Sequence, residues 1–187
     1  MKHSVSINML FPTLVLTSHS PVNPQDLQYC YQVKEQHQSV DKSNKRGYQS
    51  PLLDIPFTLP LQRLVDNILK DFTTKQTEHH KQWINVNPTG AYNQTHTHPQ
   101  SDYSIVYYLK NDDVPIRFNH PESHAAYNTI AFLHKKVEEQ LLIAPQVKIS
   151  PQPGDLYIFP AYLPHSVDEN TTPNDRVTVA WNVSLKL

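Results

Sequence analysis

The stretch RVTVAWNVSL, residues 176–185, decides the fold class, because two kinds of side chain alternate along it. Successive side chains of a β-strand point to opposite faces of the sheet, so each kind occupies one face. The apolar face is Val177, Val179, Trp181, Val183 and Leu185, and the mostly polar face is Arg176, Thr178, Ala180, Asn182 and Ser184. The stretch predicts a long strand that covers an apolar core on one side and presents polar groups on the other.

Further strands precede this one, and turn residues separate them. The candidates are WINVN (83–87), SIVYYL (104–109), VPIRF (114–118), the pair VKIS and DLYIF joined by the turn PQPGD, and a short strand near His165. Sixteen prolines against three glycines also favour short elements with fixed turns. The pattern predicts a mainly β fold with flanking helices, a sandwich or barrel of the jelly-roll type.

Two helices are expected before the strands. Asn23 and Pro24 form an N-cap and first helical residue for a segment that ends near His37. A second helix follows Pro60, where apolar residues recur at helical spacing. The adjacent His79 and His80 are expected at a helix end, in solvent or against the helix dipole.

The length of 187 residues predicts a single domain, 1–187. Within it, residues 1–81 supply an N-terminal strand and supporting helices, and 82–187 form the core. An insertion is expected around 111–146, where helical spacing returns, with a lid role as one hypothesis. His120, His124 and His134 in this segment are expected at the surface.

Composition excludes several classes of protein. A formal net charge of −1 argues against a general nucleic-acid or membrane-surface binder, which would need a surplus of Lys and Arg. The single cysteine, Cys30, cannot form an internal disulfide, which favours a reducing compartment such as the cytoplasm. No apolar run approaches the roughly 18 residues of a membrane span, and no convincing signal peptide is present.

The segment NQTHTHPQSD, residues 93–102, contains two histidines that could bind one metal ion. In an extended segment His96 and His98 point to the same side, and His165, held by Pro164, offers a third imidazole. Imidazole suits iron, copper, nickel or zinc. Arg176 would be costly to bury unless it meets an anion, and Thr178 adds a hydroxyl beside it. These groups together predict a site for a carboxylate-bearing cosubstrate that also chelates a metal.

The motifs resemble those of the Fe(II)- and 2-oxoglutarate-dependent dioxygenases, in particular a group of small 2OG-Fe(II) oxygenases with an H-x-H-P motif. The segments that carry the resemblance are NVNPTGAYNQTHTHP (85–99), SIVYYL (104–109), PGDLYIFPAYLPHSV (153–167) and RVTVAWN (176–182), and the opening LFPTLV (10–15) is similar too. The resemblance is weak before residue 80. It implies a double-stranded β-helix, a cupin-like jelly roll with the metal between its sheets.

The resemblance implies that His96 and His165 bind Fe(II). His98 occupies the position where most relatives have an aspartate or glutamate, so the chain departs from the two-histidine, one-carboxylate triad. The third ligand is then His98, Asp102 or water, and His98 is preferred.

For the cosubstrate, the resemblance implies that Arg176 with Thr178 binds the C5 carboxylate of 2-oxoglutarate, while Asn85, Asn87 and Asn182 make secondary contacts. The implied reaction consumes O2, decarboxylates 2-oxoglutarate to succinate and hydroxylates a further substrate. That substrate could be peptidyl, a nucleic acid or a small molecule, and a homodimer remains open.

Two alternatives compete with this interpretation. A cupin-type metal enzyme, an isomerase or a dioxygenase without 2-oxoglutarate, fits the spacing of Gly90, His96, His98 and Asp102, and also that of Gly154, Pro160 and His165. Tyr162 and Glu169 depart from the second cupin motif, and such an enzyme need not have Arg176. The other alternative is a non-catalytic jelly-roll binding domain without metal, which predicts that His96 and His165 lie apart.

Overall fold

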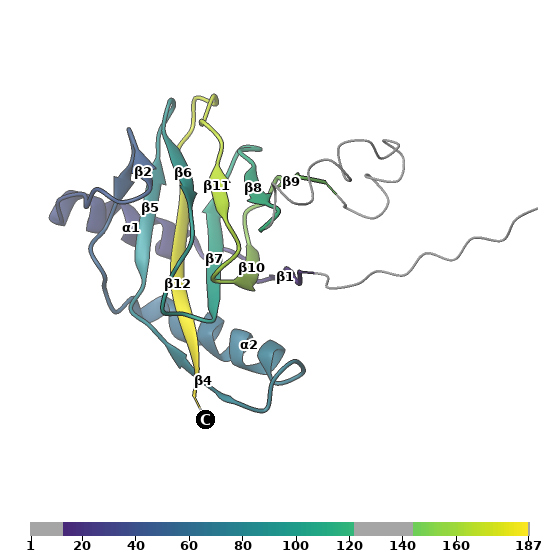
Figure 1. Ribbon diagram of the computed structural model, residues 1–187. Helices are drawn as coiled ribbons and strands as arrows, with labels where there is room; N and C mark the ends of the chain where they lie inside the picture. The colour runs from purple at the N-terminus through teal and green to yellow at the C-terminus, as the bar shows by residue number, and fades with distance from the viewer. Residues whose placement is uncertain (1–12, 122–143, 187) are drawn as a thin grey trace, which may run out of the picture.

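The structure, a computed structural model, describes residues 13–121 and 144–186 and consists of two antiparallel sheets with two α-helices (Figure 1). The larger sheet has the order β1-β10-β7-β12-β5-β3, with β4 also paired to β12, and the smaller sheet has the order β2-β6-β11-β8-β9. The mainly β, jelly-roll fold class predicted from the sequence is confirmed.

The elements have the following bounds. The helices are α1 (Pro24–Gln36), η1 (Pro56–Thr58) and α2 (Leu59–Leu69). The larger sheet contains β1 (Leu16–His19), β3 (Tyr48–Gln49), β4 (Gln76–His79), β5 (Trp83–Asn87), β7 (Tyr103–Lys110), β10 (Asp155–Pro160) and β12 (Arg176–Lys186). The smaller sheet contains β2 (Asn44–Lys45), β6 (Tyr92–His96), β8 (Ile116–Asn119), β9 (Gln146–Ile149) and β11 (His165–Val167).

Two apolar cores cover the two faces of the larger sheet. On the outer face, Val65 and Leu69 of α2 and Cys30 of α1 belong to one buried cluster with Val179 and Trp181 of β12. The second cluster lies between the sheets and joins β7 and β10 to β8; its buried members are Tyr108, Ile116, Phe118, Tyr157, Phe159 and Leu163. The apolar face of β12 therefore meets the helices, and its polar face points toward the smaller sheet, as the alternation predicts.

Both predicted helices are present. The side chain of Asn23 accepts a hydrogen bond from the Gln25 N–H at the start of α1, and Pro24 is the first helical residue. Helix α2 begins one residue before Pro60 and ends at Leu69. No helix in the described ranges is long and apolar enough to cross a bilayer.

The predicted hairpin between VKIS and DLYIF is wrong. Strand β9 pairs with β8 in the smaller sheet, whereas β10 pairs with β1 and β7 in the larger one. The turn between them crosses from one sheet to the other, and Gly154 is required in it. Its φ is +94°, and a Cβ there would lie 2.5 Å from the His19 ring. Turn residues mark where a strand ends but not which strand it pairs with.

The segment expected to be an insertion, 111–146, contains a strand of the jelly roll. Ile116–Asn119 forms β8, which pairs with both β11 and β9. Residues 122–143, with His124, His134 and the expected helix, lie outside the described residues. The N-terminal part also joins the core, because β1 and β3 extend the larger sheet and β2 extends the smaller one.

His79 lies in a strand and not at a helix end. The Trp181 Nε1–H donates a hydrogen bond to its Nδ1 at 2.9 Å, so the proton of this imidazole is on Nε2, which donates to Asp66 Oδ1 at 2.8 Å. The contact joins β12, β4 and α2. His80 Nε2 lies 2.9 Å from Ser184 Oγ. The expectation that both histidines lie at a helix end, in solvent or against the helix dipole, is therefore wrong, since His79 belongs to β4 and both pair with side chains of the folded chain.

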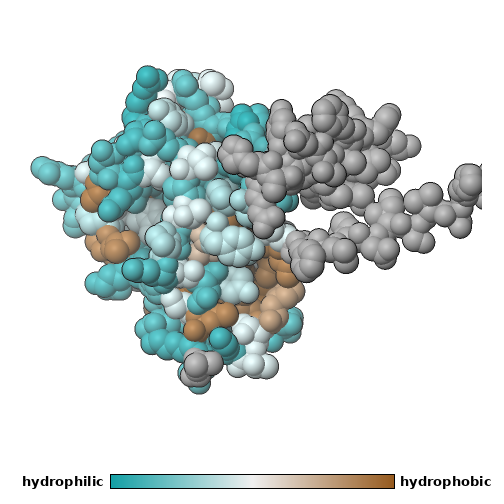
Figure 2. All heavy atoms as spheres, in the orientation of Figure 1, coloured by the Kyte–Doolittle hydropathy of each residue, from teal (hydrophilic) through white to brown (hydrophobic). Residues whose placement is uncertain are grey.

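The face of the molecule in Figure 2 is mostly hydrophilic, with small separate hydrophobic patches. The exposed large apolar side chains of the described residues are Leu14, Leu52, Leu59, Phe72 and Tyr162.

Candidate metal and cosubstrate site

Three histidines converge between the two sheets. His165 at the start of β11 is the cross-strand partner of His96 at the end of β6, and His98 follows two residues later. Their ring centroids lie 4.3 Å apart for His96 and His165, 4.9 Å for His96 and His98, and 5.2 Å for His98 and His165. One nitrogen from each ring lies within 4.8 Å of the other two. The cluster thus brings together the three histidines that the sequence singled out.

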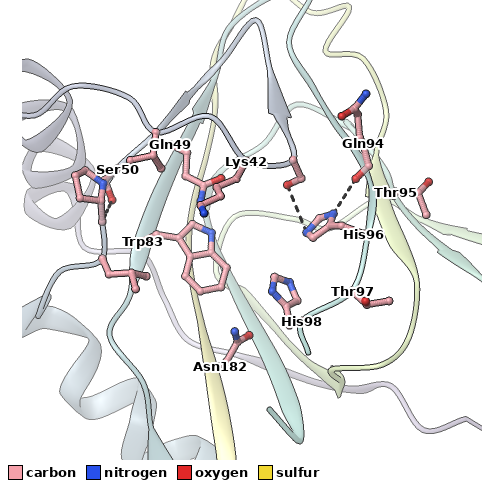
Figure 3. Close-up of a pocket in the computed structure, with 14 residues that line it drawn as sticks. Lys42, Gln49, Ser50, Trp83, Gln94, Thr95, His96, Thr97, His98 and Asn182 are labelled. Carbon is pink, nitrogen blue, oxygen red and sulfur yellow. Dashed lines mark hydrogen bonds between the residues drawn. The ribbon is translucent and has the colours of Figure 1, made fainter. Parts of the chain in front are cut away.

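Hydrogen bonds fix the tautomers of two of these rings. The Nδ1 of His96 lies 2.7 Å from the carbonyl oxygen of Gln94, and the Nδ1 of His165 lies 2.9 Å from that of Leu163. A carbonyl oxygen only accepts, so each Nδ1 carries the proton and each Nε2 presents a lone pair. The Nε2 of His96 has Ser43 Oγ at 3.5 Å (Figure 3). Both rings are oriented as metal ligands require.

The environment keeps the imidazoles neutral. Burial, with the charge of His96 as a smaller cause, lowers the pKa of His165 to about 3 and that of His98 to about 4. Burial also lowers the pKa of His96. The rings of Phe159 and Phe118 lie 4.8 Å and 6.4 Å from that of His165. Neutral imidazole is the form that binds metal, so the donor set fits a divalent ion such as Fe(II), Ni(II) or Zn(II).

Asp102, the alternative third ligand, lies elsewhere. Its side chain is exposed, and Oδ2 accepts a hydrogen bond from the Leu185 N–H at 2.7 Å. Among the described His, Cys, Asp and Glu residues, the cluster that could hold a metal contains only the three histidines. The geometry therefore favours His98 over Asp102 as the third ligand.

Arg176 is buried in the interior with unused donors. It is 3% exposed, its Nη2 lies 3.5 Å from the Tyr108 hydroxyl, and its Cζ lies 5.1 Å from the centroid of the Tyr108 ring. Its Nε and Nη1 have no hydrogen-bond partner, and no carboxylate of the described chain forms an ion pair with it. A buried guanidinium without a partner is costly, and a bidentate carboxylate would supply what it lacks.

Buried polar side chains of β5 and β12 lie next to Arg176 in the sheet. Asn87 is the cross-strand partner of Arg176, and Asn85 is that of Thr178. All four are buried, the Nδ2 of Asn85 lies 3.5 Å from Thr178 Oγ1, and the Oδ1 atoms of both asparagines lack a partner. The structure thus brings together four of the five residues predicted to bind a cosubstrate.

Asn182, the fifth, lies further along β12. Its Oδ1 accepts a hydrogen bond from Ser104 Oγ at 2.9 Å, and its side chain lines a different space, together with Trp83 and His98. The prediction that Asn182 joins Arg176 rested only on the shared face of the strand, along which the two residues are separated by Thr178 and Ala180.

A cavity of about 760 Å³ opens beside the histidines (Figure 3). Its described lining comes from the segment 40–52, from β5, β6 and β12, and from the loop after β6; the residues are Val40, Lys42, Ser43, Gln49, Ser50, Pro51, Leu52, Trp83, Gln94, Thr95, His96, Thr97, His98 and Asn182. The contribution of 40–52 could not be predicted from its polar sequence, which has no pattern that places it against the strands. Trp83 did have a signal, since it shares a strand face with Asn85 and Asn87.

Comparison of the sequence with known proteins gives one family match. A family model described as "Putative 2OG-Fe(II) oxygenase" matches residues 81–182. Among curated proteins, none matches this chain in sequence.

Solved structures match the fold at low sequence identity. An oxidoreductase of the 2OG-Fe(II) oxygenase family from Burkholderia pseudomallei superposes with a TM-score of 0.61 at 13% identity, covering 91% of this chain and 85% of its own. A prolyl-4-hydroxylase from Pseudomonas putida has a TM-score of 0.60 at 12% identity, with 92% and 93% covered. HygX from Streptomyces hygroscopicus, solved with nickel, 2-oxoglutarate and hygromycin B, has a TM-score of 0.60 at 12% identity, with 92% and 83% covered.

Proposed function

Because the chain belongs to the 2OG-Fe(II) oxygenase family, we propose that it couples the oxidative decarboxylation of 2-oxoglutarate to the hydroxylation of a further substrate. O2 is the second cosubstrate, and succinate and CO2 are the products. The iron, when bound, supplies the redox chemistry that activates oxygen. The residues of the chain hold the metal, orient the cosubstrate and exclude water from it.

His96, His98 and His165 are the proposed metal ligands. The argument rests on two observations. One nitrogen of each ring lies within 4.8 Å of the other two, and backbone carbonyls hold the proton on Nδ1 of His96 and His165, which leaves each Nε2 with a lone pair for a metal. Three neutral ligands leave the full charge of a divalent ion in place, which favours an anionic cosubstrate next to it.

Arg176 with Thr178 is the proposed partner of the C5 carboxylate of 2-oxoglutarate, and Asn85 and Asn87 are proposed as further polar contacts. The observation that carries the function is the guanidinium itself, which is 3% exposed and has two donor groups without a partner. It shares the space between the sheets with the histidines. A diacid that chelates the metal at one end has its other carboxylate available for this position.

Both alternatives fit the structure less well. A cupin-type enzyme acting without 2-oxoglutarate gives no reason for an unpaired arginine on the inner face of β12. A non-catalytic jelly roll predicted that His96 and His165 would lie apart, whereas their rings lie 4.3 Å apart.

The test uses protein purified without oxygen and supplied with Fe(II). We expect 2-oxoglutarate to bind and, once O2 is admitted, to be converted slowly to succinate even without a second substrate. Arg176→Ala should lose 2-oxoglutarate binding but keep metal binding, while Arg63→Ala, which removes an exposed arginine of α2, should behave like the unaltered protein. If the unaltered protein neither binds 2-oxoglutarate nor converts it, the oxygenase assignment is refuted.

The third ligand is tested separately by metal titration. His98→Ala should weaken metal binding by about tenfold or more, and Asp102→Ala should leave it unchanged. The opposite pattern would assign the third ligand position to Asp102. If neither variant changes metal binding, the protein supplies only two ligands.

A further inference from the structure

The residues on the inner face of the β5–β12 pair differ between its two ends, and this difference separates two binding regions. In register order, Arg176 faces Asn87, Thr178 faces Asn85, and Ala180 faces Trp83, with Asn182 beyond them. The Trp83 ring lies 5.5 Å from that of His98. The arginine is therefore at one end of this row, and the cavity that contains Trp83 and Asn182 is at the other. A cosubstrate that reaches from a metal on the histidines to Arg176 would leave the end of the cavity beside Trp83 and Asn182 free.

The described lining of the cavity has no acidic side chain. Of its fourteen residues none is Asp or Glu, and Lys42 is the one that carries a full charge. Lys42 forms no ion pair with a described residue, in contrast to its neighbour Lys45, whose Nζ lies 2.7 Å from Asp41 Oδ1. A metal ion on three neutral imidazoles would add further positive charge. The potential in this space therefore disfavours a cation and favours an anion.

The remaining walls suit an apolar body. Trp83 offers its ring, Leu52 is 61% exposed, and Val40 and Pro51 belong to the same lining. In the view of Figure 3, Lys42, Gln49 and Trp83 appear on the opposite side of the cavity from His96. Asn182 adds a donor, because Ser104 occupies its Oδ1. A volume of about 760 Å³ is in the usual range for a site that encloses one small molecule.

We propose that the prime substrate is a small organic anion whose apolar, ring-sized body packs on Trp83 and Leu52 and whose carboxylate or phosphate meets Lys42. This inference rests on the proposed function, since it takes the cavity beside the metal site as the place of hydroxylation. Charge complementarity selects an anion over an amine, and the size of the cavity fits one small molecule.

The test follows the indole N–H signals of Trp83 and Trp181 by NMR in protein loaded with redox-inert Zn(II) and 2-oxoglutarate, so that Arg176 is occupied and no turnover occurs. The probes share one ring and differ in charge: phenylacetate, phenyl phosphate, neutral phenylacetamide and cationic phenethylamine. We expect the anions to shift the Trp83 signal with about three- to tenfold higher affinity than the amide, and the amine to bind weakest. Trp181 is buried on the other face of β12 against His79 and should not respond.

Two matched variants locate the charge that is responsible. Lys42→Met should reduce the affinity for the anions to that for phenylacetamide, and Lys45→Met, which removes the same charge three residues away, should not. Phosphate preferred over carboxylate would identify the anion as a phosphate ester, and the reverse preference would identify it as an acid.

Several results would overturn the proposal. These are equal affinity for the amine and the anions, an unchanged preference in Lys42→Met, or no response of Trp83 to any probe at the highest soluble concentration. Because the readout is a signal of the chain and not turnover, the outcome is independent of the oxygenase assay. Probe binding measured also in metal-free protein separates a failure of this inference from a failure of the proposed function.

Discussion

Arg176 costs the folded protein stability, although it is central to the proposed cosubstrate site. Its guanidinium is buried with Nε and Nη1 unpaired, while Nη2 lies 3.5 Å from the Tyr108 hydroxyl and Cζ lies 5.1 Å from the centroid of the Tyr108 ring. Removing a buried charge that lacks a partner is often neutral or stabilising. The site therefore holds a charge that the fold alone does not require.

We expect Arg176→Met to leave the free energy of unfolding of the cosubstrate-free protein unchanged or to raise it by up to about 2 kcal/mol. The same change should abolish the rise in melting temperature that 2-oxoglutarate gives the unaltered protein, because a ligand stabilises only the state it binds. Denaturant titration and thermal melts measure the two effects. A loss of several kcal/mol without ligand would show that the arginine is structural.

The lowered pKa of His165 predicts that the free energy of unfolding depends on pH. Burial first, then the charge of His96, holds its pKa at about 3 in the folded chain, below the ordinary value of about 6.5. As pH falls below about 6.5 the unfolded chain takes up a proton that the folded chain refuses, so the stability contributed by this group is present above that pH and is lost below it.

In metal-free protein this single group should lower the free energy of unfolding by about 2 kcal/mol between pH 7.5 and pH 5. Urea unfolding at several pH values in the presence of a chelator measures the slope. His165→Asn should reduce the slope, with His98 and His96 supplying the remainder because their pKa values are also lowered, and an identical slope in that variant would assign the pH dependence to other groups.

At the scale of single elements, β12 shows how one strand serves two purposes. Its apolar residues belong to the cluster with α1 and α2, while Arg176, Thr178 and Asn182 point into the space between the sheets. Helix α2 holds the outer face through side chains that are fully buried, such as Val65 and Leu69. A helix that contributes no residue to the site thus packs on the back of the strand that holds Arg176.

Leu69→Ala should reduce the free energy of unfolding by about 3 kcal/mol, because it opens a cavity in the core behind the sheet. Leu59→Ala in the same helix removes the same atoms from a side chain that is 55% exposed and should cost less than about 0.5 kcal/mol. Equal losses in the two variants would contradict the packing of α2 against β12. Chemical denaturation monitored by the fluorescence of Trp83 and Trp181 measures both.

At the scale of the whole molecule, the proposed metal ligands and Arg176 belong to different sheets. His96 and His165 come from β6 and β11 of the smaller sheet, and Arg176 from β12 of the larger one. A ligand that chelates the metal and also reaches the arginine connects the two layers. Binding of metal and of 2-oxoglutarate should therefore be coupled.

We expect Zn(II) to raise the affinity for 2-oxoglutarate by about tenfold or more, and 2-oxoglutarate to raise the affinity for Zn(II) by the same factor, since coupling is reciprocal. Isothermal titrations in both orders measure the two factors. His165→Ala should remove metal binding and the coupling together. A coupling factor of one in the unaltered protein would mean that the two ligands occupy separate sites.

Local pattern determined much of this protein. Alternation along 176–185 was enough to predict the two faces of β12, and the helical spacing after Pro60 was enough to predict α2, because both depend on residues a few positions apart. The residue types and spacing of His96, His98, His165 and Arg176 were sufficient to name the candidate site. The strand faces and the helix depend on short-range geometry that the order of residues fixes directly, whereas the convergence of His96 and His165 depends on the pairing of β6 with β11.

The tertiary structure alone decided which segments meet. It placed β9 beside β8, paired His79 with Trp181 and Asp66, and brought the segment 40–52 over Trp83 to form the cavity. It also separated Asn182 from Arg176 on one strand face. The physical reason is that strand partners and cavity walls depend on packing between residues distant in the chain, and many such pairings satisfy the same local pattern.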